Sequence, residues 1–384
     1  MPQTILIAGS LAQRPGYGGM AWVFLQYVLG FKRLGWNVLF LDWLAPAMCR
    51  DRAGKLCAVE DSWNYAWLRD VMQEHGLADN WSLDYNEGGR IFGRTRAEVL
   101  ETAGRAALLI NVMGFLTDRE ILDRPAKRVF LDIDPGFGQM WQELGLAKIS
   151  EGHDAWLTVG ENIGRDDCSI PLCGLEWIAT PQPVVLDRWP VSTAPCAAPF
   201  TSIVSWRGPF GPVEYGGRTY GLRVHEFRKF VALPHRTGQQ FDLALDIDAS
   251  EMNDLALLRD NHWNLLDPRA TVATPSDYRA FIGRSKAELM IAKNMYVATN
   301  GGWVSDRSIC YLASGRPVLA QDTGFSRNYP TGEGFLAFGT LDEARDGVEE
   351  INRNYERHCR AARVIAEEHF DSDQVLARLL GKLL

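Results

Sequence analysis

Short apolar runs alternate with amphipathic segments along most of this chain. The apolar run 4–10 is followed by a glycine-rich turn, and residues 20–34 then carry apolar side chains at helical spacing. A second apolar run starts near Val38. Short apolar runs bounded by glycine turns indicate buried strands, so the chain opens with a predicted strand–helix–strand unit. Such units build parallel sheets that bind ligands at the carboxyl ends of their strands.

The same pattern continues through the first half of the chain. A predicted helix at 95–105 leads into the apolar run 107–114, and a short helix around 118–122 precedes the run 128–134. A further apolar run covers 155–160. We therefore predict an α/β fold with a doubly wound parallel sheet.

A proline-rich, irregular stretch covering 168–199 interrupts this pattern, which resumes with a predicted strand at 199–208. The length of 384 residues exceeds what one core comfortably organises. We predict a first domain at 1–180, a linker at 181–199 and a second domain at 200–370.

Within the second half, three local features carry expectations about structure. The segment 209–221 is long and glycine-rich, which predicts a mobile cover over a cleft. Ser276 is expected to cap a helix that runs through Arg284. An amphipathic helix is predicted to begin around Leu341.

The segment from Tyr296 to Phe325 reads as a strand, a glycine turn, a capped helix, a glycine stop and a second strand. Gly301 and Gly302 can take positive φ, and Ser305 is a good N-cap. A helix N-terminus that follows a glycine turn gathers free N–H groups at the positive end of the helix dipole, which suits a phosphate. The alternative is an ordinary crossover connection.

Two motifs in this segment resemble those of family 1 glycosyltransferases. Residues 302–305, Gly-Trp-Val-Ser, look like part of the Cys-Gly-Trp-Asn-Ser element, and residues 313–318 resemble Ala-x-Gly-x-Pro-Val. The resemblance implies the GT-B fold, in which two Rossmann-like doubly wound domains face each other across a cleft. It also implies that the first domain binds the acceptor, the second binds the nucleotide-sugar donor, and a last helix at 371–384 crosses back to the first domain.

The resemblance also implies a set of donor-binding residues. The helix N-terminus would receive the diphosphate, an acid–amide pair after the second strand would contact sugar hydroxyls, and a basic group would follow the strand 199–208. The nucleoside base would contact the turns before and within 264–278. These donor-site candidates are Arg207, Asn264, Tyr278, Gly301, Gly302, Ser305, Asp306, Gln321 and Asp322.

Two positions depart from the family pattern. The diphosphate histidine of the family falls on Asn300 or Gly301, and the ribose-binding glutamate falls near Ser308 or Cys310. Asp306 is the nearest substitute for that glutamate, although it also suits the helix dipole as a simple stabilising charge.

Gly16, Gly18 and Gly19 form a glycine-rich loop before the first helix. Their spacing does not match the dinucleotide fingerprint, and no Walker lysine follows them. In GT-B proteins an equivalent loop faces the cleft and lets the backbone approach the reacting sugar. The alternative is a plain flexible turn.

Asp132 and Asp134 lie at the carboxyl end of the strand 128–134, where a ligand cleft is expected. Either acid could serve as the catalytic base if its pKa were raised, whereas a structural role would make Asp134 a turn former. His153 is the competing candidate for the base, although adjacent residues on an extended chain point to opposite sides, so His153 and Asp154 are not a dyad.

Asp132-Ile133-Asp134 matches the metal-binding Asp-x-Asp pattern in letters, but it continues an apolar run and precedes Pro-Gly. We interpret it as a strand end and therefore expect catalysis without a metal ion, with helix amides and Arg207 stabilising the leaving diphosphate. A divalent cation becomes the alternative if that interpretation is wrong. Residues 51–93, rich in Trp, Tyr, Asn and Asp, are expected to shape an acceptor pocket, unless they only pack on the surface.

Composition limits the partners and the cellular compartment that we expect for this protein. The net charge of −8 argues against general binding of nucleic-acid polymers. Seven cysteines with no paired zinc spacing fit a reduced cytoplasm. The chain starts directly with a predicted strand, without the features of a signal peptide, and no apolar run reaches membrane-spanning length. We expect a cytoplasmic protein with no membrane partner, and its oligomeric state stays open.

Together these features favour a glycosyltransferase that moves a sugar from a nucleotide-sugar, most simply a UDP-sugar, to the hydroxyl of a small-molecule acceptor without a cofactor. Two alternatives remain from other classes. A GT-B nucleotide-sugar epimerase would use the same donor site, and a catalytically silent protein would only bind the donor.

Overall fold

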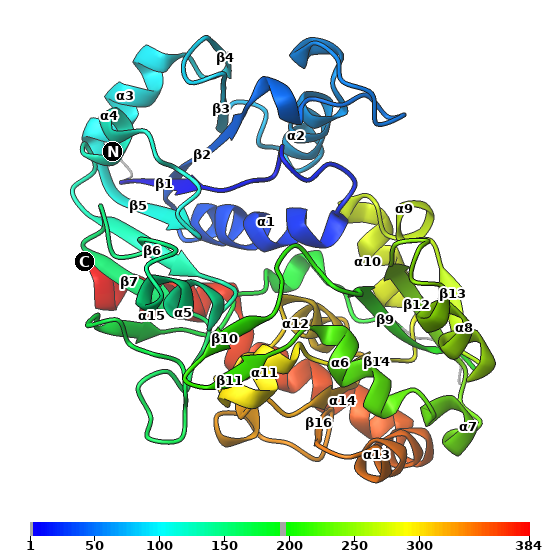
Figure 1. The fold of residues 1–384 in the computed structure, drawn as a ribbon. Helices are drawn as coiled ribbons and strands as arrows, with labels where there is room; N and C mark the ends of the chain where they lie inside the picture. The colour runs from blue at the N-terminus through cyan, green and yellow to red at the C-terminus, as the bar shows by residue number, and fades with distance from the viewer. Residues whose placement is uncertain (1–2, 193–196) are drawn as a thin grey trace.

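The computed structural model describes residues 3–192 and 197–384. The chain forms two α/β units, one above the other in Figure 1, each built on its own mainly parallel sheet. The two-domain α/β architecture predicted from the sequence is therefore confirmed.

The first unit contains an eight-stranded sheet in the order β4-β3-β2-β1-β5-β6-β7-β8. All neighbouring strands are parallel except β3 and β4. The strands are β1 Thr4–Ala8, β2 Asn37–Leu44, β3 Trp81–Tyr85, β4 Arg90–Gly93, β5 Ala106–Val112, β6 Arg128–Asp132, β7 Ala155–Thr158 and β8 Trp177–Ala179. The helices are α1 Gly18–Arg33, α2 Trp63–Glu74, α3 Arg96–Arg105, α4 Arg119–Leu122 and α5 Phe137–Glu143.

The second unit contains a six-stranded sheet, parallel throughout, in the order β13-β12-β9-β14-β15-β16. Its strands are β9 Phe200–Ser205, β12 Phe241–Asp246, β13 Asn264–Leu266, β14 Ala287–Met290, β15 Val318–Gln321 and β16 Phe335–Phe338. The helices are α6 Arg223–Phe227, α7 Leu233–Thr237, α8 Met252–Asp260, α9 Pro268–Thr271, α10 Pro275–Arg284, α11 Asn294–Thr299, α12 Asp306–Ala313, α13 Leu341–Arg353, α14 Tyr355–Ile365 and α15 Ser372–Leu383.

Helix α1 lies at the contact between the two units, and most of its side chains are buried there. It packs against α10 of the second unit and against the C-terminal helix α15. The end of the chain therefore lies against its first helix, and one hydrophobic cluster contains residues of both units. This shared core holds the two units together.

The linker is more ordered than its proline content suggests. Val184, Val185 and Trp189 are almost fully buried, and a 3-10 turn covers Leu186–Arg188. Residues 193–196, which include Pro195 and Cys196, lie outside the described residues.

Three local expectations are corrected. The first element of the segment Tyr296–Phe325 is the end of helix α11 and not a strand. The strand of this unit is β14, which ends at Met290, before α11 begins. Helix α10 is capped by Thr274, whose side chain accepts from the amide of Asp277 at 3.0 Å, and not by Ser276.

The segment 209–221 is also different from the expectation. It forms a hairpin of β10 Val213–Tyr215 and β11 Arg218–Tyr220, whose end residues Val213 and Tyr220 are 4% and 3% exposed. A hairpin therefore stands where an irregular loop was expected, with two buried side chains at its ends and mostly exposed residues between them. Among the described residues no helix is long and apolar enough to cross a membrane.

Candidate functional site

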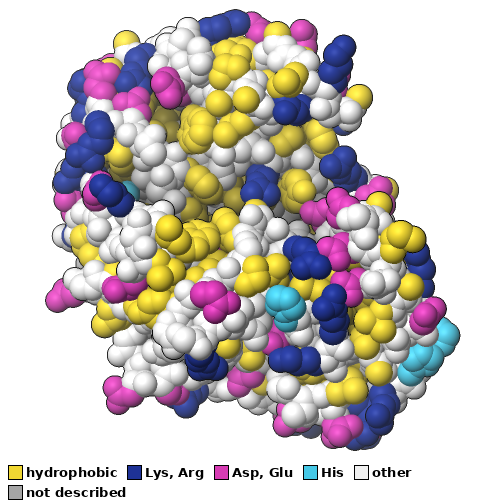
Figure 2. Space-filling view, in the orientation of Figure 1, with side chains coloured by type: hydrophobic (Ala, Val, Ile, Leu, Met, Phe, Trp, Pro, Cys, Tyr) yellow, Lys and Arg dark blue, Asp and Glu magenta, His cyan; other side chains and the backbone are white. Residues whose placement is uncertain are grey.

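A cavity of about 320 Å³ lies between the two units. The glycine loop before α1 forms its wall on the first unit, and the carboxyl ends of β9 and β12 form the wall opposite. These strand ends are paired in register, Ser205 with Asp246. Figure 2 shows the surface hollowed between the upper and lower halves, with hydrophobic side chains along the hollow.

The glycines of the loop allow the two units to approach closely. A Cβ on Gly18 would overlap the carbonyl oxygen of Thr274, and one on Gly19 would lie 2.8 Å from the ring of Tyr278. Gly16 has a φ of 79°, which disfavours a side chain. All three glycines and Tyr278 line the cavity. The loop is therefore a close contact between the units at the edge of the cavity.

Arg223, at the start of α6, is the most unusual residue of the cavity. It is 8% exposed, and its Nε is buried with no hydrogen-bond partner. No ion pair of its guanidinium is found among residues 3–192 and 197–384. Burial, and then the neighbouring Arg307, lowers the pKa of Arg223 to about 10. Asp134, Glu288 and Asp306 lie near enough to favour its charge, but none pairs with it directly. A buried cation without a direct partner is costly, and an anionic ligand would supply one.

Arg307, in the first turn of α12, lines the same cavity. Its Nε donates to the fully buried carboxylate of Glu288, and its Nη1 donates to the carbonyl of Ile203 at 2.8 Å. Its Nη2 is buried without a partner. Glu288 balances its charge, but one donor of the guanidinium is left over. The neighbouring Asp306 also lines the cavity, and burial raises its pKa.

Lys293 and Asp134 meet across the cleft from different units. The Nζ of Lys293 lies 2.9 and 3.0 Å from the two carboxylate oxygens of Asp134, and 3.1 Å from the hydroxyl of Tyr296. The ammonium also lies over the rings of Phe137 and Phe210. Both charged side chains keep some exposure, 16% for Lys293 and 20% for Asp134. This ion pair therefore stands at the border between the cavity and solvent.

Asp132 is used inside the first unit. It is 1% exposed and accepts hydrogen bonds from Gln139 at 2.6 Å, Thr158 at 3.0 Å and the amide of Asp134 at 3.0 Å. Burial raises its pKa to about 6. These bonds hold the turn that presents Asp134, so Asp132 positions this turn and does not face the cavity.

His153 lies before the amino end of β7, whereas Asp134 follows the carboxyl end of β6, which runs parallel to β7. Its ring packs edge-on against Phe130 and its Nε2 lies 3.1 Å from the amide nitrogen of Asn111. The structure therefore corrects the expectation that His153 competes with Asp134 for the base, because the two lie at opposite ends of the sheet.

The N-terminus of α12 has the expected cap, because the Ser305 hydroxyl accepts from the amide of Arg307 at 3.2 Å. The glycine turn before it does not face the cavity. The amide of Gly302 donates to Thr323 and the carbonyl of Gly301 accepts from Asn162. A Cβ on Gly302 would lie 2.7 Å from the Asn162 side chain. The two glycines hold the units together, which corrects their assignment as phosphate contacts.

The two residues predicted to contact sugar hydroxyls, Gln321 and Asp322, hydrogen-bond within the second unit instead. Gln321 donates to Glu226 at 2.6 Å and accepts from the amide of Ala292 at 3.1 Å. Asp322 accepts from the amide of Gly324 at 2.8 Å and from the Ser326 hydroxyl at 2.6 Å, so it forms a turn. Neither lines the cavity.

Of the two remaining donor-site candidates, one lines the cavity and one does not. Arg207 lines the cavity, but its guanidinium pairs with Glu251. Asn264 stands at the amino end of β13 and donates to Asp242 at 2.9 Å, whereas the cavity is at the carboxyl ends of this sheet. The structure therefore contradicts the prediction that Asn264 contacts the nucleoside base.

Sequence reasoning missed Arg223, Lys293 and Arg307. Lys293 comes directly after the apolar run 289–292, as Asp134 comes after its own strand, so the carboxyl-end rule could have found it. Arg307 follows the Ser305 cap. Nothing in the local sequence marks Arg223, because its isolation is a product of burial between the units.

Among the described residues no three His, Cys, Asp or Glu side chains gather as a metal site. The six described cysteines are free. In the strand end 132–134, Asp132 and Asp134 have separate partners, as given above.

The chain matches no known protein-family profile, and no curated protein sequence matches it. Solved structures do match over nearly the whole chain. Sucrose-phosphate synthase from Thermosynechococcus elongatus aligns at 12% identity and a TM-score of 0.57, covering 99% of both chains. HepE of Anabaena in complex with UDP-glucose aligns at 12% identity and 0.58, again over 99% of both chains. An α-glucosyltransferase in complex with UDP and DNA aligns at 10% identity and 0.56, over 100% of both chains.

These neighbours are glycosyltransferases of the GT-B type, and the similarity extends across both units. The GT-B fold implied by the two sequence motifs is therefore confirmed. At such low identity the similarity establishes the fold, and the activity has to be argued from the cavity.

Proposed function

We propose that this protein is a glycosyltransferase that takes a sugar from a nucleotide-sugar donor, a UDP-sugar, and transfers it to the hydroxyl of a small-molecule acceptor. The observation that carries the proposal is the unpaired, buried guanidinium of Arg223 beside Arg307 and Lys293 in the cavity between the units. A pyrophosphate supplies the negative charge and the acceptor oxygens that the Nε of Arg223 and the Nη2 of Arg307 lack.

The three cations come from the second unit, as expected for a donor site in this fold. As the bond to the sugar breaks, negative charge grows on the leaving diphosphate, and cations already in place stabilise it without reorganising. This arrangement supports transfer without a metal ion or a cofactor. UDP is the nucleotide bound by HepE, and two other neighbours of this fold were solved with UDP.

Asp134 is the proposed base, which would take the proton from the acceptor hydroxyl, with Asp132 fixing its position. It is the carboxylate of the first unit that reaches the cleft beside the donor cations. The acceptor is less constrained by similarity, because one neighbour was solved with DNA and another with an N-acetylglucosaminyl glycerol. A small acceptor is our choice because the net charge of −8 opposes a polyanionic polymer.

Thermal unfolding with UDP, UMP and uridine tests the donor site. Binding at a hundred times Kd adds about 2.7 kcal/mol to the free energy of unfolding, so UDP should raise Tm clearly more than UMP, and uridine least. A set of UDP-sugars is then incubated with and without hydroxylated acceptors. Transfer to an acceptor supports the proposal, conversion of the donor alone identifies an epimerase, and binding without conversion identifies a silent binding protein. Equal effects of UDP and uridine would overturn the diphosphate site.

A further inference from the structure

A second cavity of about 530 Å³ lies in the first unit, away from the second unit. The carboxyl ends of β2 and β3 and the helices α3 and α4 enclose it. Leu41, Val99, Leu116 and Ile121 give it an apolar floor. Part of its wall, from Ser82 to Ile91, belongs to the aromatic and polar stretch 51–93, where an acceptor pocket was predicted.

Trp43 and Asp42 connect this cavity to the glycine loop of the cleft. The carboxylate of Asp42 accepts from the amide of Ala12 at 2.6 Å, and the carbonyl of Trp43 accepts from the side chain of Gln13 at 3.2 Å. The chain then continues directly to Pro15 and Gly16, which line the cleft cavity. Residues 12–16 therefore connect the wall of this cavity with the wall of the cleft cavity.

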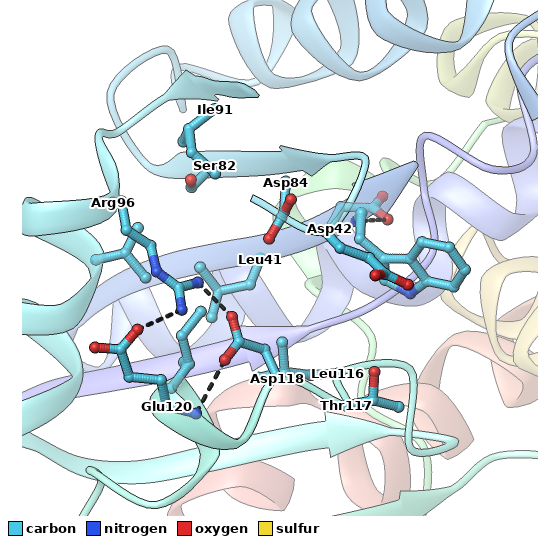
Figure 3. A pocket seen from close by; sticks show the side chains of 14 residues that line it. Leu41, Asp42, Ser82, Asp84, Ile91, Arg96, Leu116, Thr117, Asp118 and Glu120 are labelled. Atoms are coloured by element: carbon cyan, nitrogen blue, oxygen red, sulfur yellow. Dashed lines mark hydrogen bonds and ion pairs between the residues drawn. The ribbon is translucent and has the colours of Figure 1, made fainter. Parts of the chain in front are cut away.

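The polar wall of the cavity has more negative than positive groups. The carboxylates of Asp84 and Asp118 point into the same space in Figure 3. Arg96 pairs with both Asp118 and Glu120, so these two acids are balanced in part. Asp84 accepts from the amide of Gly88 at 2.6 Å, and no ion pair of Asp84 occurs within residues 3–192 and 197–384.

Glu87 and Asp42 also contribute to the charge of the cavity wall. Glu87 also lines the cavity, is exposed, and has no ion pair in the described part of the chain. Asp42 already accepts hydrogen bonds from the amides of Ala12 and Trp43, and burial raises its pKa to about 8, which disfavours its charged form. The uncompensated charge therefore lies on Asp84 and Glu87, at one side of an apolar floor.

We propose that this cavity binds the acceptor, and that the acceptor combines an apolar ring or chain with a protonated amine that pairs with Asp84. The proposal rests on the proposed transferase function and adds the chemical class of its acceptor. The apolar part would cover Leu41 and Leu116, the ammonium would complete the pairing of Asp84, and the hydroxyl would extend along the loop to the cleft.

Two p-nitrophenyl glycosides provide a matched pair of probes, because p-nitrophenyl glucosaminide carries a free amine where p-nitrophenyl glucoside carries a hydroxyl. Calorimetry at pH 7 should find the glucosaminide bound at least about tenfold more tightly, since hydrogen bonds to charged groups are the strong ones. This preference should shrink in high salt, because exposed charges are screened.

Variants locate the site. Asp84→Asn keeps an oxygen for the Gly88 amide and should remove the preference for the amine. Asp260→Asn, an equal charge change on an exposed residue of the second unit, should leave it unchanged. Leu116→Trp fills the floor and should weaken both probes. Equal binding of the two probes, or a preference that survives in Asp84→Asn, would overturn the proposal.

UDP binding, measured on the same samples, separates this proposal from the transferase function. An amine preference that depends on Asp84 without any UDP binding would support the cavity and contradict the transferase. UDP binding with no amine preference would contradict only the acceptor class.

Discussion

Replacing Arg223 by methionine should make the protein more stable and a poorer binder of UDP. The guanidinium of Arg223 is 8% exposed, its Nε has no partner, and burial lowers its pKa from 12.5 to about 10. Lowering the pKa by about 2.5, at about 1.36 kcal/mol for each pKa unit, corresponds to a cost of roughly 3 kcal/mol for keeping the buried guanidinium charged. Methionine keeps the apolar stem and removes that cost.

The expected gain is smaller than this figure because some relaxation and water penetration already reduce the penalty. Replacing buried charges by apolar residues of similar volume is often neutral or stabilising by about 1–4 kcal/mol. We expect the free energy of unfolding of Arg223→Met to rise by about 1–3 kcal/mol in the absence of ligand. A lost hydrogen bond to a charged group is worth about 1.5–3 kcal/mol, so UDP affinity should fall about ten- to hundredfold.

Urea unfolding gives the stability of the free protein, and calorimetry gives the affinity for UDP. Arg259→Met, at an exposed arginine of α8, is the matched control and should change neither quantity appreciably. A variant that is destabilised by more than about 1 kcal/mol and still binds UDP normally would show that Arg223 is a structural residue, and the reasoning would be refuted.

Three further predictions follow from the two units and their contacts. Asp134→Asn should lower turnover by about a hundred- to ten-thousandfold while UDP affinity is largely kept, and near-normal turnover would reject Asp134 as the base. Gly18→Ala should destabilise the protein by about 1–3 kcal/mol in urea unfolding, because its Cβ would overlap the carbonyl of Thr274; a change of a few tenths would mean that the units separate freely. Burial raises the pKa of Glu161 to about 7, above its usual 4.5, so the folded state binds more protons between these values and stability falls as pH rises through this window. Glu161→Gln should therefore be more stable than the unchanged protein above pH 7 and lose this advantage near pH 4.5, and a stability difference independent of pH would contradict the assignment.

The sequence predicts the fold well wherever apolar periodicity and local caps act together. Ser305, Gly315 and the run after Pro317 define α12 and β15 without any tertiary information, and the structure has both elements where they were expected. The C-terminal helix could not be placed by periodicity, and its place beside α1 was implied only by the resemblance.

Local errors have local reasons. The apolar letters from Tyr296 to Ala298 suit a strand as well as a helix, and only packing makes them helix α11. Pro275 favours the first helical position, which puts the cap of α10 on Thr274 and not on Ser276. Neither error changes the fold, because β14 supplies the strand before α12 and α10 begins only two residues earlier than expected.

The site was predicted only in part, because its chemistry depends on contacts between units. The glycine loop and Asp134 could be placed at strand ends, and both reach the cleft. Motif resemblance put the phosphate at Gly301 and Gly302, but their polar groups bond to Thr323 and Asn162. The buried isolation of Arg223 has no counterpart in the sequence.

The two sides of the interface between the units differ in kind, and this difference bears on how the base becomes available. On the closed side, α1 packs against α10 and α15, and Asn162 bonds to the carbonyls of Asn300 and Gly324. On the cleft side, the Lys293–Asp134 pair is partly exposed, and Lys293 lines the cavity. A diphosphate beside Arg223 would compete with Asp134 for the Lys293 ammonium. Donor binding is then expected to release the Asp134 carboxylate toward the acceptor, so that the base is free when a sugar is present to be transferred.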